Sequence, residues 1–131
     1  MVLAEAMRRT ADLDLAWVGG LAETWAPPFY AVGARGFTSG LINVLPARSV
    51  AIHAALEQAD YPLAMRLIDE MLPFEELRAM ENNGTNVTVV KSALRLMGDD
   101  CGATRAPSAW PLTPSQSEAL QALLQKWELA D

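Results

Sequence analysis

The sequence has one cysteine, one histidine and few basic residues, and each scarcity argues against a class of function. Cys101 cannot form an internal disulfide, and no second Cys or His cluster accompanies it to share a metal. The 10 Lys and Arg residues are scattered in a chain of net charge -6, whereas nucleic acids and anionic membranes are bound by clustered positive charge. We therefore expect no metal, no cofactor, no nucleic-acid partner and no membrane partner.

Long hydrophobic runs are also missing. The N-terminal stretch carries charge from Glu5 onward and has no apolar core of a secretory signal. No later run approaches the ~20 apolar residues that span a membrane. The two Asn-x-Thr sequences at 83–85 and 86–88 are therefore interpreted as a turn and a helix cap, not as glycosylation sites. Together with the lone cysteine, these absences favour a cytoplasmic protein.

What the sequence does contain is a short strand–helix–strand pattern. The apolar run at 14–18, stopped by Gly19 and Gly20, predicts a buried strand, and 36–40 predicts a second one. A helix is expected between them at 22–33, with its two prolines at 27 and 28 acceptable only in the first turn. Because the connection is a helix, the two strands should lie parallel.

The rest of the chain has helical spacing, and several boundaries carry clear signals. Asp60 is a good cap for the helix expected at 62–81. Pro73 lies inside that helix and should kink it. Thr113 and Gln116 are spaced as a capping box. The buried stripe of the last helix is expected at Leu120, Leu123, Leu124 and Trp127. Further helices are expected at 2–10, within 47–60, at 62–81 and at 86–98.

The run "GARGFTSGLINV" at 33–44 allows three interpretations. It could be a structural turn, a phosphate-binding loop, or the rim of an active site at the end of a strand. The phosphate loop has the least support, because neither G-x-G-x-x-G nor Gly-Lys-Ser/Thr is present. The first strand also ends in glycines followed by Glu23, so both strands deliver polar groups and flexible backbone to one edge, where α/β folds keep their chemistry.

Two parallel strands need neighbours on both edges, so a sheet of only the two expected strands would be incomplete. The segments "WVGGLAE", "GARGFTSGLINVLP", "NNGTNVTVVKSALRLMG" and "ATRAPSAWPL" together resemble the C-terminal part of the dihydrodipicolinate synthase/N-acetylneuraminate lyase family. Within that family they resemble the branch that includes 5-dehydro-4-deoxyglucarate dehydratase. The resemblance implies an α/β fold: the C-terminal portion of a (β/α)8 barrel, with about two parallel strands and a helical extension, mostly α-helical in this chain.

The resemblance implies that 1–45 hold the last barrel strands and helix, and that 46–131 hold the final barrel helix and the extension. It also implies class I aldolase chemistry, in which a lysine forms a Schiff base with a 2-oxo acid. That lysine would lie on the sixth strand, upstream of this sequence. Lys91 and Lys126 lie in helices and are expected to be structural or solvated. We therefore expect a lyase or dehydratase segment with no catalytic residue of its own.

Five residues are expected to contact substrate by this resemblance: Gly20, Glu23, Thr38, Ser39 and Gly40. The Thr38 carbonyl would face the Schiff-base lysine. Many relatives have an aspartate within "GLAE", at 20–23, so the identity of the 2-oxo acid stays open. The substrate would bind only with the missing half of the barrel, and we expect a homo-oligomer or association with an N-terminal half. Two alternatives are a subunit of a split barrel enzyme and a helical protein-interaction domain.

Overall fold

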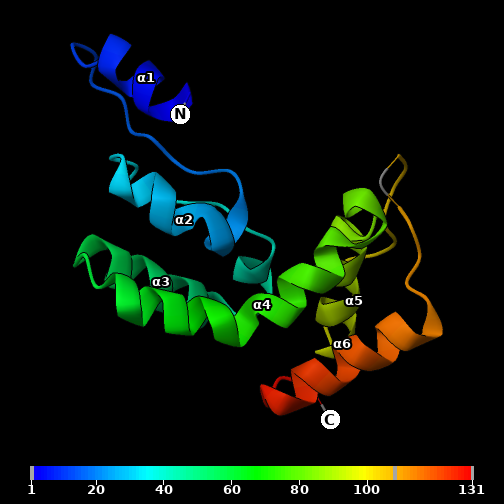
Figure 1. Cartoon of the computed structure of the whole chain (residues 1–131). Coiled ribbons are helices and arrows are strands. Elements are labelled where there is room, and N and C mark those ends of the chain that lie inside the picture. The colour runs from blue at the N-terminus through cyan, green and yellow to red at the C-terminus, as the bar shows by residue number, and fades with distance from the viewer. Residues whose placement is uncertain (1, 108, 131) are drawn as a thin grey trace. The chain divides into compact units, whose positions relative to one another are not determined.

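The computed structural model describes residues 2–107 and 109–130, and its regular elements are helical (Figure 1). They are α1 (Val2–Arg9), α2 (Ala22–Ala31), the 3-10 turn η1 (Leu41–Asn43), α3 (Pro46–Glu57), α4 (Tyr61–Asn83), α5 (Asn86–Leu96) and α6 (Pro114–Lys126). In the part of the chain that is described, none of these helices combines the length and the apolar character needed to cross a membrane.

The chain divides into two compact units. The first contains the chain up to Ile42 together with Pro46–Asp69, and the second contains Asn43–Leu45 and the chain from Glu70 onward. The division inside α4 falls directly after Asp69, four residues before Pro73. A proline cannot donate to the carbonyl four residues back, so the helix loses a hydrogen bond at this division.

In the first unit, two extended segments run parallel to each other and meet at a bridge between Gly19 and Phe37. The Gly19 N–H donates to the Gly36 carbonyl at 2.8 Å, and the Thr38 N–H donates to the Gly19 carbonyl at 2.9 Å. The Arg35 N–H adds a bond of 2.9 Å to the Trp17 carbonyl. The expected parallel pairing of the two segments is therefore confirmed.

The expected strands at 14–18 and 36–40 are wrong in length and regularity, because the described residues contain this one bridge and no strand. The chain leaves the pair almost at once on both sides: α2 begins at Ala22 and η1 begins at Leu41. A ladder grows only where successive residues of both segments stay paired, and strand neighbours on the outer edges would normally hold them extended.

The core of the first unit forms where α2 packs against α3, which lie side by side in Figure 1. Its buried apolar side chains are Ala26, Tyr30, Ala34, Leu41, Ile52, Ala55, Leu56, Ala64 and Ile68. Pro27 and Pro28 lie inside α2, past its first turn. The expectation that the helix accepts them only in its first turn is therefore wrong. The helix tolerates them at the cost of the bonds to the carbonyls of Glu23 and Thr24.

The second unit is built from the C-terminal part of α4 with α5 and α6. Its buried apolar side chains are Val44, Met71, Phe74, Leu77, Val89, Ala93, Leu120, Leu123 and Leu124. The expected buried stripe of α6 is confirmed at Leu120, Leu123 and Leu124. Trp127, at the C-cap, is half-buried, and its ring lies 6.0 Å from that of Phe74. The capping box is confirmed as well: the Gln116 N–H donates to Thr113 Oγ1 and the Thr113 N–H donates to Gln116 Oε1.

Helix α4 runs through Pro73, and its non-helical backbone angles occur later, at Met80, Glu81 and Asn82. Asp60 caps its start as expected, by accepting from the Leu63 N–H at 3.0 Å. The turn after α4 is closed by Thr85, whose hydroxyl donates to the Leu77 carbonyl at 2.8 Å. This buried threonine, at the N-cap of α5, fixes the path from α4 to α5.

Candidate functional site

The bridge between Gly19 and Phe37 brings the predicted contact residues to one edge of the first unit. Gly20 and Thr38 follow the two bridged residues directly, and the Ala22 N–H donates to the Thr38 carbonyl at 3.2 Å. This bond occupies one of the two lone pairs of the carbonyl that was expected to face a lysine. Gly20 and Thr38 are exposed, whereas Ser39 and Gly40 are half-buried. The edge therefore presents glycine backbone and the Thr38 hydroxyl.

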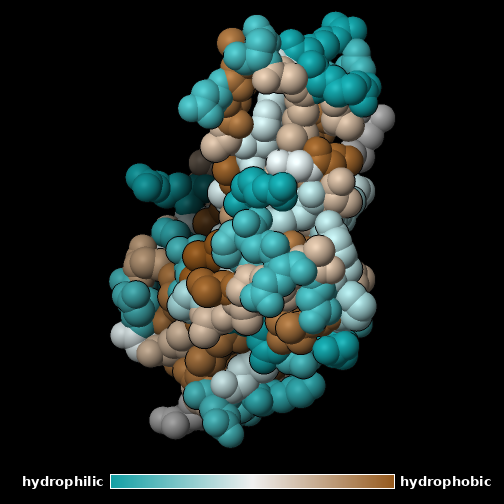
Figure 2. Space-filling model, turned by 90° about the vertical axis from the view of Figure 1, so that its left-hand side faces the viewer, coloured by the Kyte–Doolittle hydropathy of each residue, from teal (hydrophilic) through white to brown (hydrophobic). Residues whose placement is uncertain are grey.

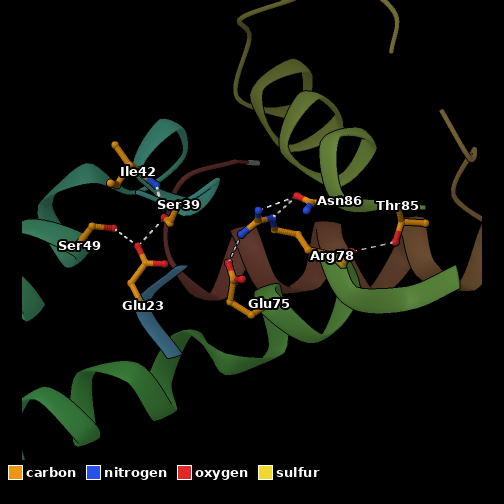
Figure 3. A network of polar contacts seen from close by, with 8 residues as sticks. All are labelled: Glu23, Ser39, Ile42, Ser49, Glu75, Arg78, Thr85 and Asn86. Carbon is orange, nitrogen blue, oxygen red and sulfur yellow. Dashed lines mark hydrogen bonds and ion pairs between the residues drawn. The ribbon is translucent and has the colours of Figure 1, made fainter. Parts of the chain in front are cut away.

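Glu23 lies behind this edge, and its side chain is fully enclosed by protein, with 0% exposed. Its Oε1 accepts two hydrogen bonds, from the Ser39 hydroxyl at 2.6 Å and from the Ser49 hydroxyl at 2.5 Å (Figure 3). The Ser39 Oγ in turn accepts from the Ile42 N–H at 3.3 Å. One carboxylate oxygen thus connects α2 with the segment before η1 and with α3.

The second oxygen of Glu23, Oε2, is also buried and has no hydrogen-bond partner within the described residues. Hydroxyls bonded to a carboxylate are held in place, but without a histidine in the network they form no nucleophile–base–orienter triad. The arrangement suits binding and positioning rather than covalent catalysis. Direct contact between Glu23 and a substrate stays a prediction.

A second polar pair lies on the helices behind the edge. The Tyr30 hydroxyl and the His53 Nδ1 are 2.7 Å apart, and the two rings meet edge to face. Burial raises the pKa of the Tyr30 phenol above its usual value, the negative charge of Glu57 raises it further, and Arg35 opposes the shift. His53 lines a cavity of about 290 Å³ in the first unit. The other residues that line it are Gly36, Phe37, Ile42, Pro46, Ser49 and Val50.

Hydrophobic side chains reach the surface of the molecule on the face shown in Figure 2. Independently of that view, the extended segment before α2 in the first unit has three exposed hydrophobic residues: Leu13, Leu15 and Val18 are 54%, 50% and 58% exposed. A segment predicted to be a buried strand is therefore largely uncovered. No group of three His, Cys, Asp or Glu side chains that could hold a metal is found in the described residues.

The sequence profile of the Dihydrodipicolinate synthetase family matches residues 1–127. The chain belongs to the dihydrodipicolinate synthetase family. A 5-dehydro-4-deoxyglucarate dehydratase of Pseudomonas putida is 33% identical over 92% of this chain and 40% of its own length. A 4-hydroxy-tetrahydrodipicolinate synthase of Corynebacterium urealyticum is 36% identical over 94% of this chain and 39% of its own length. The sequence resemblance, with its dehydratase branch, is thus confirmed.

Solved structures agree with this assignment to the dihydrodipicolinate synthetase family. Dihydrodipicolinate synthase from Oceanobacillus iheyensis aligns with a TM-score of 0.85 and 40% identity over 96% of this chain and 42% of that one. The enzyme from Bacillus clausii aligns with a TM-score of 0.87 and 38% identity. This family member therefore spans about two fifths of the length of the relatives it matches.

The two lysines of the chain, Lys91 and Lys126, both lie on helices of the second unit. Lys91, on α5, donates to the carbonyls of Cys101, Gly102 and Ala103 at 3.2, 3.3 and 3.0 Å. It is structural, as expected, because it holds the loop after α5. The Gly102 N–H and then Arg95 keep the pKa of Asp100, in the same loop, below its usual range. Lys126 is exposed on α6.

Two partners in these networks were not singled out from the sequence. Ser49 completes the Glu23 network from α3, and Tyr30 pairs with His53 across 23 residues of sequence. Each interaction joins a residue of α2 to a residue of α3, which is distant in sequence. No local spacing pattern in the sequence therefore predicts it. The burial of Glu23 is itself a finding of the structure, and a buried carboxylate requires donors close by.

Proposed function

We propose that this chain is the C-terminal segment of a Schiff-base-forming lyase or dehydratase that acts on a 2-oxo sugar acid. The carrying observation is the parallel pairing at Gly19 and Phe37, which delivers the rim residues to one edge in a member of this family. On this proposal 1–45 contribute the last strands and helix of a (β/α)8 barrel, and 46–131 contribute its final helix and a helical extension. The names of the dehydratase relatives support the substrate class.

The rim would bind substrate, and the nucleophile would come from elsewhere. Thr38 would offer its exposed hydroxyl, and Gly20 and Gly40 would let backbone approach the substrate closely. Schiff-base formation needs an amine with a free lone pair. Lys91 instead directs its amine at three carbonyls of the loop after α5, so its N–H groups are engaged there. We infer that the catalytic lysine belongs to a part of the barrel outside this chain, so that the chain alone is inactive.

Trapping with borohydride tests this proposal. The purified chain is incubated with pyruvate and sodium borohydride, and its intact mass is measured beside that of the Pseudomonas putida dehydratase as a positive control. We expect the control to gain a reduced pyruvate adduct and this chain to gain none. A stoichiometric adduct that peptide mapping places on Lys91 or Lys126 would show that the chain carries its own nucleophile.

A second candidate is a subunit of a split barrel, and the hydrogen-bond register of the paired segments favours it. Because Gly19 directs both its backbone groups at the 36–38 segment, its neighbour Val18 directs its N–H and carbonyl to the opposite edge. By the same alternation, Phe37 directs its backbone groups away from Gly19. Neither residue has a backbone partner in the described part of the chain. Both edges are therefore open to a further parallel strand.

Hydrogen exchange tests this second candidate. Adding a polypeptide that carries the remaining strands should slow exchange of the Val18 and Phe37 amides, because each would gain a carbonyl partner. The Ile68 amide, inside α4, is the internal control and should not change. If the chain instead stays a well-dispersed monomer whose Val18 and Phe37 amides never gain protection, the helical interaction domain becomes the better account.

A further inference from the structure

The network around Glu23 has a feature that direct substrate contact does not explain. A carboxylate that binds substrate needs to reach the pocket, but Glu23 is completely enclosed and its Oε1 is occupied by two protein hydroxyls. Burying a carboxylate is costly unless donors compensate it. Both donors here are serines, from two other parts of the fold. The Glu23 carboxylate is therefore placed where it can connect α2 with the segment before η1 and with α3.

Ser39 is the point where this network reaches the rim. Its hydroxyl donates to Glu23 Oε1, and the same oxygen accepts from the Ile42 N–H. The second donor, Ser49, lies in the first turn of α3 and is itself buried. The path from Glu23 through Ser39 to Ile42 determines how the chain turns between the Gly19–Phe37 bridge and η1 (Figure 3). Thr38 and Gly40 flank Ser39 in the sequence, and Thr38 is also held by its own backbone bonds to Gly19 and Ala22.

We propose that Glu23 is a positioning residue: it sets the conformation of the 38–40 rim by accepting the Ser39 hydroxyl, with Ser49 anchoring the carboxylate to α3. It does not touch the substrate. The value of the rim to catalysis rests on the proposed function, whereas the positioning itself is a property of this chain. The arrangement depends on the acceptor oxygen Oε1, and no ion pair of Glu23 with a cation is found in the described part of the chain.

Backbone hydrogen exchange on the full chain tests the proposal without requiring activity. The readout is the Ile42 amide, which is protected by Ser39 Oγ, and the Ala55 amide inside α3 reports whether the unit stays folded. Glu23→Ala removes the acceptor, and we expect the Ile42 amide to exchange roughly ten-fold faster, since hydrogen bonds to charged groups are among the stronger ones. Glu23→Gln keeps an acceptor oxygen and should restore most of the protection. Glu118→Gln, on the exposed face of α6, is the matched control and should change nothing.

A double-mutant cycle separates action through Ser39 from a general loss of packing. Ser39→Ala alone should speed Ile42 exchange, and adding Glu23→Ala to it should speed it no further. Ser39→Ala leaves the bond between Glu23 and Ser49 intact and gives the exchange rate of an Ile42 amide that has lost its acceptor. If Glu23→Ala unfolds the unit, the rate in Glu23→Gln is compared with this reference. Unchanged Ile42 exchange in Glu23→Ala, full additivity in the cycle, or a Gln variant as fast as Ala would each overturn the proposal. If the proposed enzymatic function fails, the exchange results still stand.

Discussion

The environment of Tyr30 predicts a pH effect on stability. Burial, followed by the charge of Glu57, raises the pKa of its phenol above the ordinary 10.0. The folded chain therefore retains a proton that the unfolded chain releases at high pH, and this stabilising contribution is complete below the unfolded pKa. We expect the free energy of unfolding to decline as the pH rises from about 10 through the higher folded pKa.

Ultraviolet titration checks this expectation for Tyr30. The phenolate absorbance of Tyr30, obtained as the difference between the wild type and Tyr30→Phe, should appear above pH 10.0. Urea unfolding of Tyr30→Phe should show a weaker pH dependence in the same range. A Tyr30 signal at or below its ordinary pKa would contradict the enclosed position of this phenol beside His53.

Gly19 gives a second prediction at the residue scale, because its neighbour leaves no room for a side chain. A Cβ at this position would lie 2.3 Å from Cδ2 of Phe29. Gly19→Ala should therefore destabilise the chain by roughly 1–3 kcal/mol, as overpacking does elsewhere. Gly20→Ala is the matched control, since a Cβ there meets nothing within 4 Å. Equal midpoints of urea denaturation for the two variants would contradict the close contact between Gly19 and the Phe29 ring.

At the scale of the element, α6 depends on its capping box. Thr113→Ala removes the acceptor for the Gln116 N–H and should cost about 1 kcal/mol of stability. Ser117→Ala, an exposed change further along the same helix, should cost much less. Chemical denaturation of both variants measures the difference. A Thr113 variant as stable as the wild type would mean that the helix does not need its cap.

The elements also show what the sequence could and could not predict. The α6 cap and buried stripe were predictable because caps and helical periodicity are local signals, and Asp60 is predictable for the same reason. The strand at 14–18 was predicted from an apolar run and the one at 36–40 from the short segment after the helix stop at Gly33, but the length of both depends on neighbours outside the pair. The candidate site shows the same difference between features with a local sequence signal and features that depend on tertiary packing. The rim is predicted from the glycines and hydroxyls and stays a prediction, whereas Ser49 joins the Glu23 network only through tertiary packing.

At the scale of the whole molecule, two observations support the proposed barrel segment. The chain spans about two fifths of the relatives it matches, and the segment before α2 leaves Leu15 and Val18 at least half exposed. Apolar side chains in a parallel strand pair are normally covered on both faces. We interpret the exposed side chains as the contact surface for the rest of a barrel, in agreement with the open backbone edges at Val18 and Phe37.

The position of a trapped Schiff base tests the central claim most directly. The N-terminal part of the Pseudomonas putida dehydratase, up to the start of the matched region, is fused to this chain, and the chimera is treated with pyruvate and borohydride. We predict one reduced adduct, which peptide mapping places on a lysine of the grafted part and which persists in a Lys91→Met, Lys126→Met chimera. An adduct on Lys91 or Lys126, or a folded chimera that traps no pyruvate, would contradict the assignment of this chain to the C-terminal segment of a Schiff-base enzyme.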